Sequence, residues 1–542
     1  MDFSKLTKDD LEKMNKGVLI TIILSMQMQL SNISNQLNFL TEQIALMNQR
    51  TFGRKTEQAD EMHQITLFEY FNEPEALSDD SPEPEVSEVV VSTYTRKRKT
   101  KREEKLEGLP ARIIEHTIDE AKLSELFPDG YKELPIETYK RLSIIPQTLM
   151  VDEHHVHVYA SKKNDGTIIR AERPTDLFTN SMATPSLVAS IMTGKYQNHL
   201  PLDRQSTVFK SNGVYLESNT LANWMIKASD NYLSLVYDEL IKQLKQFNVI
   251  HADETPFRVI KKDKPVGGSK SYMWVYRSGA YDLSHPIIIY DYQPSRKAEH
   301  PEEFLGGYSG VLVTDGYQVY HSLEKKKNNL KVAGCWVHAK RKFAELVKAL
   351  GDKTSDSLIA AEATKRISEI FHIDKTLTDL DKQQRKDERQ RLVKPKVDDF
   401  FAWAKDKINL LPAGGATYDG LQYCINQEQF LRVFLSDGNV PMDNNLAEQA
   451  IRPFTLGRKN WVNMFSSKGA QSSSVIYSLV ETAKANNLRV YDYLELLLSE
   501  IPKHMSDTNL DFLQYLMPWS DKVKEKCQVL SKPKTTDQYL SL

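Results

Sequence analysis

Apolar residues recur at alternating steps of three and four near the start of the chain. The series has these positions: Ile23, Met26, Leu30, Ile33, Leu37, Leu40, Ile44 and Met47. This is the a/d spacing of a coiled-coil seam, and it lasts for more than three heptads. It predicts a coiled-coil helix over residues 8–50, within an N-terminal segment 1–55. Its expected role is self-association, and the alternative is packing against its own chain.

The same region raises the question of a membrane anchor, because residues 17–41 carry no charged side chain. Its apolar core, residues 18–26, is much shorter than the roughly 20 residues that a helix needs to cross a bilayer. No small-residue cleavage site follows it. We therefore expect no membrane association and a cytoplasmic location.

The pattern then becomes charged. Residues 73–88 hold seven acidic residues and three prolines, and residues 96–105 hold seven basic residues. Such blocks bury too little apolar surface to fold, so residues 56–106 are predicted to be a linker. Its basic run could contact a phosphate backbone or remain solvated. Residues 107–180, with short β-type runs at 142–145 and 155–160, are predicted to form a small mixed subdomain.

Helical periodicity dominates residues 181–246. Residues 203–211 are predicted to form one helix, Asn212 and Gly213 a turn, and Ser218 the cap of a second helix that runs through Trp224. This is a candidate helix-turn-helix for DNA binding, although many helical hairpins share the pattern.

Strand and turn signals alternate in the next segment. Strands are predicted at 247–252, 272–277, 286–290 and 310–314, with a helix at 296–304 before the last strand. Three strands, a helix and a strand are the layout of an α/β ribonuclease-H-like fold, in which the first and fourth strands are neighbours. The first strand is predicted to end at Asp253 and the fourth at Asp315, so these two carboxylates should lie side by side.

Each aspartate also has an ordinary explanation. Asp315 precedes Gly316, and Asp-Gly is common turn chemistry, while Asp253 stands next to another acidic residue, Glu254. The pair is more informative than either member, because adjacent carboxylates repel each other unless a cation lies between them. The pair therefore predicts a metal site.

A third acidic residue lies near the start of a predicted short helix within residues 443–461. Asp443 or Asn444 can cap its first turn, and Pro453 is predicted to end it. Glu448 and Arg452 are four residues apart and share a helix face. By itself this pair is best explained as a solvent-exposed ion pair on a surface helix.

Composition narrows the candidate chemistry. The 542 residues imply several domains, and 71 Lys plus Arg against 73 Asp plus Glu give a net charge of −2. Affinity for nucleic acid would therefore come from local basic patches. The three cysteines, Cys335, Cys424 and Cys527, are scattered, which fits a reducing compartment and neither a disulfide framework nor a four-cysteine zinc site.

Several blocks of the chain resemble the bacterial insertion-sequence-66 transposases. The main ones are residues 248–257, 313–317, 334–343 and 443–453, and further similarity at 52–55, 195–204, 478–486 and 516–519 extends over nearly the whole chain. The resemblance implies a DDE transposase in which Asp253, Asp315 and Glu448 are the catalytic, metal-binding triad. It also implies a catalytic domain at 247–469 with a helical insertion at about 345–435, and a helical C-terminal region at 470–542.

The implied reaction cleaves the ends of an insertion sequence and joins the 3′-hydroxyl to target DNA. Two Mg²⁺ ions, for which Mn²⁺ can substitute, would be held with Asp253 between them and Asp315 and Glu448 on either side. The implied partners are the element ends, the target DNA, further copies of the chain and accessory proteins of the same element. The alternatives are a nuclease that cuts without joining, and a DNA-binding oligomer without activity.

Basic residues follow the third acid. Arg452, Arg458 and Lys459, with Trp461, are predicted to bind DNA near the cleaved end, against the alternative of a solvated helix edge. Cys335 to His338 resembles a Cys-x-x-His element that follows the second aspartate in several such families. A catalytic role and a packing role both fit it.

One feature departs from the family pattern. Its members commonly carry a Cys-x-x-Cys zinc-binding region before the catalytic domain, and residues 107–180 contain no cysteine. Zinc is therefore not expected, and the end recognition attributed to that region is not carried over.

Overall fold

The computed structural model of the chain describes residues 15–52, 149–160, 168–173, 175–260, 270–282, 284–327, 329–351 and 358–529. The chain divides into two compact units, one with residues 1–54 and 172–528, the other with residues 55–171 and 529–542. The described part of the second unit contains an antiparallel pair, β1 (Val158–Ala160) and β2 (Ile168–Arg170). The predicted linker and the predicted strand at 142–145 lie outside the described residues.

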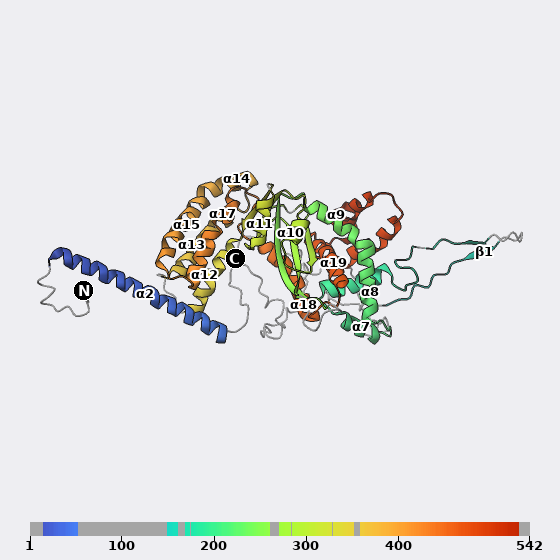
Figure 1. Cartoon of the computed structure of the whole chain (residues 1–542). Helices are drawn as coiled ribbons and strands as arrows, with labels where there is room; N and C mark the ends of the chain where they lie inside the picture. Colours follow the sequence, from blue (N-terminus) through green and yellow to red (C-terminus); the bar gives the residue numbers. More distant parts are fainter. Residues whose placement is uncertain are drawn as a thin grey trace, which may run out of the picture. The chain divides into compact units, whose positions relative to one another are not determined.

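A five-stranded mixed sheet forms the centre of the first unit (Figure 1). Its order is β5-β4-β3-β6-β7, with β4 antiparallel to both neighbours and β6 parallel to both of its own. The strands are β3 (Val249–Arg258), β4 (Lys270–Ser278), β5 (Ile288–Gln293), β6 (Gly310–Thr314) and β7 (Leu330–Gly334). The predicted pairing of the first and fourth strands, β3 and β6, is confirmed. β7 is an additional strand that the hydrophobic pattern did not predict.

The predicted end of the first strand at Asp253 is wrong, because β3 continues through Pro256 to Arg258. Pro256 lacks an N–H group and is tolerated only where one side of a strand needs no donor. β6 pairs with β3 only from Val249 to His251, whereas β4 pairs with it as far as Arg258. The second half of β3 is therefore an edge, which explains how the strand passes the proline.

Successive residues of the central strands enter two different cores, as expected for a sheet covered on both faces. Val249 and Val313 pack with α12 (Trp336–Leu350), whereas Ile250 and Leu312 pack with the helices of the opposite face. Figure 1 shows helices on both sides of the sheet. Two further helices connect strands in the sequence: α10 (Glu299–Phe304) follows β5, and α11 (Gln318–Lys326) follows β6.

Residues 359–435 are mainly helical, and the start at about 345 that the resemblance implied for the insertion falls inside α12. The elements are α13 (Ile359–Lys375), α14 (Lys382–Glu388), η6 (Arg389–Val393), α15 (Lys394–Lys407), η7 (Ile408–Leu410), α16 (Ala416–Asn426), α17 (Glu428–Leu431) and η8 (Val433–Leu435). Arg389 is fully buried, and its guanidinium donates to both carboxylate oxygens of Asp374 at 2.7 and 3.0 Å. This buried pair ties α13 to η6.

The opposite face is covered by helices from two separate parts of the chain. The first part contains α6 (Pro185–Met192), η3 (Thr193–Gln197), α7 (Leu202–Ser211), α8 (Ser218–Ala228), η4 (Ser229–Leu233) and α9 (Ser234–Leu244). The second contains α18 (Asn445–Trp461), α19 (Ser467–Ala485), α20 (Val490–Glu500), η9 (Ile501–His504), η10 (Asp511–Leu516) and α21 (Asp521–Cys527). The helix-turn-helix pattern is matched by α7, a turn with Gly213 at φ 84°, and α8. Its predicted cap is wrong, because Glu217, not Ser218, precedes the helix.

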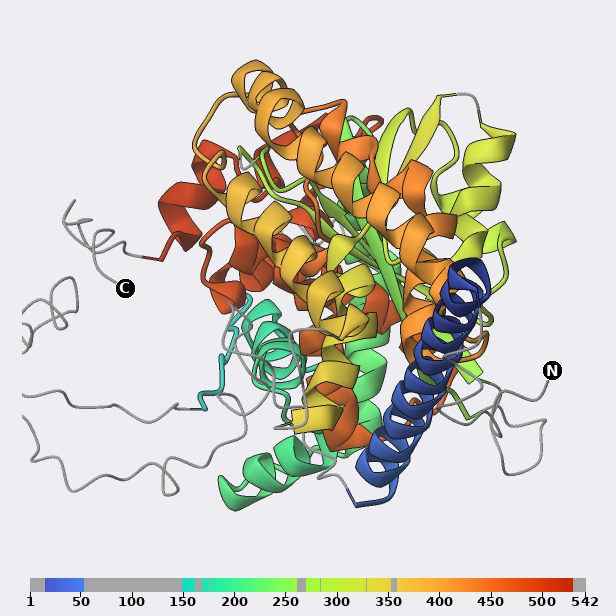
Figure 2. The ribbon, with the colours of Figure 1, turned by 90° about the vertical axis from the view of Figure 1, so that its left-hand side faces the viewer.

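The predicted coiled-coil helix is present as α2 (Lys16–Phe52). In Figure 2, α2 (blue) runs beside the yellow and orange helices, and it contacts α12. The buried carboxylate of Glu42 accepts a hydrogen bond from the hydroxyl of Thr417 in α16 at 2.5 Å. Every residue of the heptad seam is more than half exposed, from Met26 at 53% to Leu30 at 66%. The helix thus packs against its own chain through another stripe and leaves the seam uncovered. Among the described residues, no helix has the length and apolar character needed to cross a membrane.

Candidate active site

The pairing of β3 and β6 brings Asp253 and Asp315 toward the same end of the sheet. The last paired residues are His251 and Val313. Asp253 lies two residues beyond His251 on β3, and Asp315 comes directly after Thr314, the last residue of β6. The charge of Asp315 raises the pKa of Asp253, so the two carboxylates lie within electrostatic range of each other.

Glu254, the acidic neighbour of Asp253, has a different environment. Strand alternation turns its side chain to the other face, where its carboxylate is 1% exposed and forms an ion pair with Arg296. The hydroxyl of Tyr320 donates to the same carboxylate at 3.0 Å, and Arg296 stacks over Tyr317 with 3.7 Å between guanidinium carbon and ring centre. Glu254 therefore has its own cationic partner in Arg296 and a hydrogen-bond donor in Tyr320.

Asp253 is a carboxyl group in an unfavourable environment. Burial raises its pKa well above the usual value, and the charges of Glu254, Asp315 and Glu448 raise it further. Its Oδ1 accepts a hydrogen bond from the amide of Glu254 at 2.8 Å, which partly opposes the rise. Mutual repulsion among these acids indicates a site suited to a cation.

Asp315 forms a turn and lies within electrostatic range of two other acids. Its Oδ1 accepts a hydrogen bond from the amide of Tyr317 at 2.9 Å, and Gly316 between them has φ 92°. This is ordinary turn chemistry. Its charge also raises the pKa of Asp253 and of Glu254, so the same aspartate belongs to the acidic cluster.

The helix that carries Glu448 is longer than predicted. α18 continues through Pro453 to Trp461, so the predicted termination at the proline is wrong. The buried side chains of Ile451 and Phe454 pack in the core on either side of Pro453, and this packing outweighs the backbone hydrogen bond that proline removes.

Asn444 fastens the start of α18 to the strand that carries Asp253. Its Oδ1 lies 2.9 Å from Nδ1 of His251, and its Nδ2 donates to the carbonyl of Ala252 at 2.9 Å. Its backbone amide donates to Sγ of Cys335 at 3.3 Å, and its side chain is fully buried. The sequence suggested Asn444 only as a cap, but α18 has no side-chain cap hydrogen bond from it.

Asp443 serves the local turn. Its Oδ1 accepts a hydrogen bond from the amide of Asn445 at 3.0 Å, as expected for an acid placed at a helix start. Burial raises the pKa of Asp443, and the charge of Glu448 raises it further. The two acids of this segment therefore have different surroundings, since Glu448 projects toward another helix.

Glu448 faces α12. Its Oε2 lies 3.4 Å from Nη2 of Arg341, and its Oε1 lies 3.7 Å from Nε2 of His338. Oε1 of Glu448 is buried and has no hydrogen-bond partner. Nδ1 of His338 is also buried and also has no hydrogen-bond partner. Arg341 was not among the residues singled out from the sequence; its spacing of three from His338 puts both on one face of α12.

The residues of the Cys-x-x-His element have different surroundings. Trp336 is fully buried, and its indole donates to the carbonyl of Leu431 at 2.8 Å, so it is a core residue. His338 faces Glu448. Cys335 is fully buried, and burial raises the pKa of its thiol to about 12.

In the described residues, one group of three possible ligand atoms lies within 4.8 Å: those of Cys335, His338 and Glu448. It would offer one sulfur, one nitrogen and one oxygen. The three predicted carboxylates do not form so close a group in the described residues. They nevertheless fit a hard divalent cation in donor type, since all three offer carboxylate oxygens, the charges of Asp315 and Glu448 both act on the half-buried Asp253, and Oε1 of Glu448 lacks a hydrogen-bond partner.

The predicted DNA-binding residues have unequal surroundings. Arg458 donates to the hydroxyl of Thr255 at 3.3 Å and to the carbonyl of Pro256, so it lies against the strand of Asp253. Arg452 is half-buried and Lys459 is exposed. Trp461 is half-buried, with Nζ of Lys195 5.5 Å from its ring centre.

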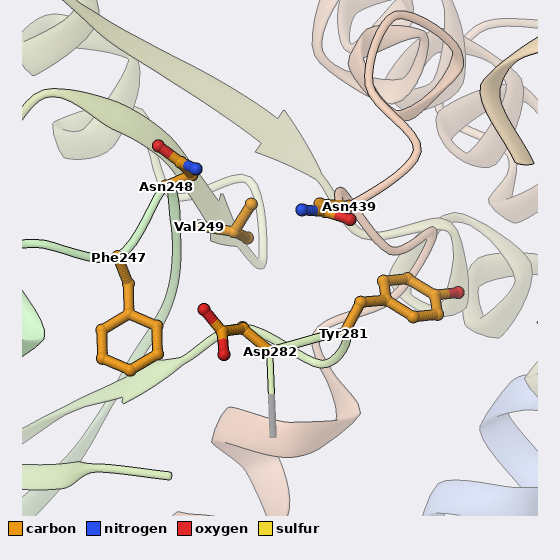
Figure 3. A pocket seen from close by; sticks show the side chains of 7 residues that line it. Phe247, Asn248, Val249, Tyr281, Asp282 and Asn439 are labelled. Carbon is orange, nitrogen blue, oxygen red and sulfur yellow. The ribbon is translucent and has the colours of Figure 1, made fainter. Parts of the chain in front are cut away.

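A small hollow elsewhere on the sheet is separate from these residues. It lies at the beginning of β3, and Figure 3 shows its lining side chains, among them Phe247, Tyr281, Asp282 and Asn439. Asp253 lies further along the same strand, beyond the part that pairs with β6. The hollow therefore has no part in the acidic cluster.

The sheet order β5-β4-β3-β6-β7, with β3, β6 and β7 parallel and β4 antiparallel to its neighbours, is that of the class of ribonuclease-H-like α/β proteins. The chain belongs to the IS66 family of transposases. The model described as "Transposase IS66 family" matches residues 180–472, "IS66 C-terminal element" matches 478–519, and "Transposase C of IS166 homeodomain" matches 39–114. The family assignment made from the sequence blocks is confirmed.

Similar chains come from Sinorhizobium fredii (strain NBRC 101917 / NGR234). The chain is 27% identical to the uncharacterized protein y4qI over 395 residues, 71% of each chain. It is 30% identical to y4hP over 351 residues, 62% of each chain, and 28% identical to y4jD over 399 residues, 72% of this chain and 76% of that one. Among solved structures, a Mos1 transposase paired-end complex with left transposon end is similar at 11% identity and a TM-score of 0.12, covering 49% of this chain and 81% of that one. A TM-score this low does not show a shared fold.

Proposed function

We propose that this transposase cleaves the ends of its insertion sequence and joins the freed 3′-hydroxyl to target DNA, with Asp253, Asp315 and Glu448 holding two divalent cations. The observation that carries the proposal is the parallel pairing of β3 and β6, since Asp253 lies on β3 two residues beyond the last paired residue, Asp315 comes directly after β6, and the charge of Asp315 raises the pKa of Asp253. The fastening of α18 to β3 through Asn444 supports Glu448 as the third member.

The reaction has two chemically similar steps. In the first, a water oxygen attacks the phosphorus at the element end, the bond from phosphorus to the 3′-oxygen breaks, and a 3′-hydroxyl is released. In the second, that hydroxyl attacks a target phosphodiester and displaces a target 3′-oxygen. Bound Mg²⁺ or Mn²⁺ would supply charge stabilisation to the attacking and leaving oxygens.

The residues of the chain prepare the site for this chemistry. Asp253 and Asp315 supply oxygen ligands from a rigid sheet, and Glu448 supplies one from a helix fastened to the same strand. Arg341 and His338 lie against Glu448 and orient it. Arg458, which contacts Thr255 and Pro256, supplies positive charge for the DNA backbone beside the site.

The partners belong to the same proposal. DNA ends and target DNA are the substrates, and a second copy of the chain joins through the exposed heptad seam of α2. Accessory proteins of the same element remain a proposal from the family resemblance alone. A nuclease that cuts without joining and an inactive DNA-binding oligomer are the competing functions.

The test uses labelled DNA that carries the termini of the element encoding this chain. We expect nicking in Mg²⁺ or Mn²⁺, none after chelation, and loss of nicking with retained DNA binding in Asp253→Asn. Asp282→Asn, an exposed acid at the other end of the sheet, is the matched control and should cut normally. Undiminished cutting by Asp253→Asn would refute the triad, and strand-transfer products separate a transposase from a nuclease that only cuts.

A further inference from the structure

The turn between α18 and α19, residues 462–466, is attached to the catalytic strand. The amide of Met464 donates to the carbonyl of Arg258 at 3.1 Å, and the amide of Ile260 donates to the carbonyl of Met464 at 2.8 Å. The side chain of Met464 is buried. This turn is therefore held at a constant distance from Asp253, which lies on the same strand.

Two apolar side chains on either side of this anchor point into solvent. Val462 is 67% exposed and Phe465 is 79% exposed. Val462 also has φ 58°, a conformation that is strained for a β-branched residue. Strained backbone that holds apolar side chains in water is a feature of binding sites, because the free energy it costs is not recovered within the fold.

The surrounding charge indicates the kind of partner. From Gln449 to Val480 the chain contains Arg452, Arg458, Lys459 and Lys468 and no acidic residue. Lys468 follows Phe465 by three positions and is exposed, as is Arg258 opposite the turn. An exposed aromatic ring among basic side chains suits a partner with a flat apolar face and a negative backbone, which describes an unpaired nucleotide.

Phe465 offers a more accessible ring than Trp461. A Cβ atom added at Gly457 would lie 2.3 Å from Cη2 of Trp461, which shows how closely that indole packs on its own helix. Lys195 lies over the same indole. Trp461 is therefore packed against its own chain, whereas the ring of Phe465 is exposed and accessible to a base.

We infer that Phe465 stacks on an unpaired base of the element end, several nucleotides from the cleaved bond. The inference rests on the proposed function and specifies which form of DNA the site takes. Asp253 and Arg258 are five positions apart on β3, which corresponds to roughly 17 Å at about 3.3 Å per residue. At about 3.4 Å per base pair, Phe465 reaches about five base pairs from the cleaved phosphate.

The experiment compares the full-length chain on two labelled duplexes with the element's terminal sequence. One is fully paired, and the other has its last five base pairs replaced by a non-complementary fork. Wild type should bind the fork more tightly than the duplex. Phe465→Ala should weaken fork binding by roughly 5- to 150-fold and duplex binding by less than about twofold.

Three further variants assign the effect. Phe465→Trp retains a stacking ring and should bind like wild type, whereas Phe465→Leu retains apolar volume without a ring and should behave like Phe465→Ala. Tyr515→Ala, at an aromatic that is 66% exposed in the C-terminal region, is the control and should change neither affinity. Equal fork preference in wild type and Phe465→Ala, or equal losses in the Trp and Ala variants, would overturn the inference.

Binding and cutting are measured separately, so the two proposals can fail separately. Asp253→Asn should keep the fork preference, because Phe465 acts in binding. If wild type prefers the fork through Phe465 but never nicks DNA, the proposed reaction fails and the stacking site remains. If nicking depends on Asp253 but no variant at Phe465 changes fork binding, the stacking inference fails by itself.

Discussion

Asn444 and His251 form a buried side-chain pair, with 2.9 Å between Oδ1 of the amide and Nδ1 of the imidazole, that joins the start of α18 to the catalytic strand. The same amide donates to the carbonyl of Ala252, the residue before Asp253. The elements that carry Asp253 and Glu448, which are far apart in the sequence, are thereby joined by one side chain. We therefore regard Asn444 as a positioning residue for Glu448.

Replacing Asn444 by alanine should reduce both stability and cleavage. The change leaves a buried imidazole nitrogen and a buried carbonyl without partners, which costs about 2–5 kcal/mol in the free energy of unfolding. Urea denaturation measures this cost, and the nicking rate at saturating DNA should fall more than about tenfold. Asn445→Ala, at the next position, is the control. Normal nicking by Asn444→Ala would contradict the positioning role.

Glu448→Gln should abolish nicking, whereas Asp443→Asn should mostly preserve it. Asp443 uses its carboxylate to accept a local amide hydrogen bond, and an asparagine oxygen can accept the same bond. Glu448 has an oxygen, Oε1, without a hydrogen-bond partner, 3.7 Å from Nε2 of His338, and the charge of Glu448 raises the pKa of Asp253. Single-turnover nicking at equal DNA occupancy measures the difference, and the reverse order of effects would assign the third ligand to Asp443.

Asp253→Asn should raise the melting temperature in the absence of divalent cations while it abolishes cleavage. The pKa of Asp253 is raised in the folded state, so folding is disfavoured as pH rises above the unfolded value, and asparagine removes that penalty. Scanning calorimetry at pH 8 with a chelator measures this. Millimolar Mg²⁺ should then stabilise wild type and leave the variant unchanged. A variant that Mg²⁺ stabilises as much as wild type would place the ion elsewhere.

Stability should fall as pH decreases from about 6.5 to about 4, in part because of His251. Burial lowers its pKa to about 4, from 6.5. Between these values the unfolded chain binds a proton that the folded chain excludes, so stability is full above 6.5 and is lost toward 4. The loss is on the order of 3 kcal/mol. Denaturation curves at several pH values should show a shallower dependence in His251→Gln, and an identical slope would argue against a neutral buried imidazole.

Charges in the exposed seam of α2 should prevent self-association. Leu30→Asp together with Leu37→Asp places two carboxylates in a seam where both positions are more than 60% exposed in the single chain. Sedimentation should show a smaller assembly. Thermal denaturation should show an unchanged melting temperature of the unit that contains the five-stranded sheet. Met28→Asp, which is exposed but outside the seam, is the control. If the double variant sediments like wild type, the seam does not mediate association.

Much of the fold follows from local pattern. The heptad spacing predicted α2, the strand runs predicted β3 to β6, and the helical periodicity predicted α7 and α8 before them. Errors occur where tertiary packing outweighs local preference. Pro256 and Pro453 were both expected to end an element, and in each case the neighbouring structure carries the chain past the proline.

The sequence by itself determined which acidic residues are candidates, because Asp253 and Asp315 follow strand runs and Glu448 lies in a helix turn. It also determined the family, through blocks spread along the chain. Only the tertiary structure decided their partners. Glu254 is neutralised by Arg296, Glu448 faces His338 and Arg341, and Asn444 joins α18 to β3. The physical reason is that strand alternation and helix periodicity are local properties, whereas charge pairing and burial depend on which distant segments the fold brings together.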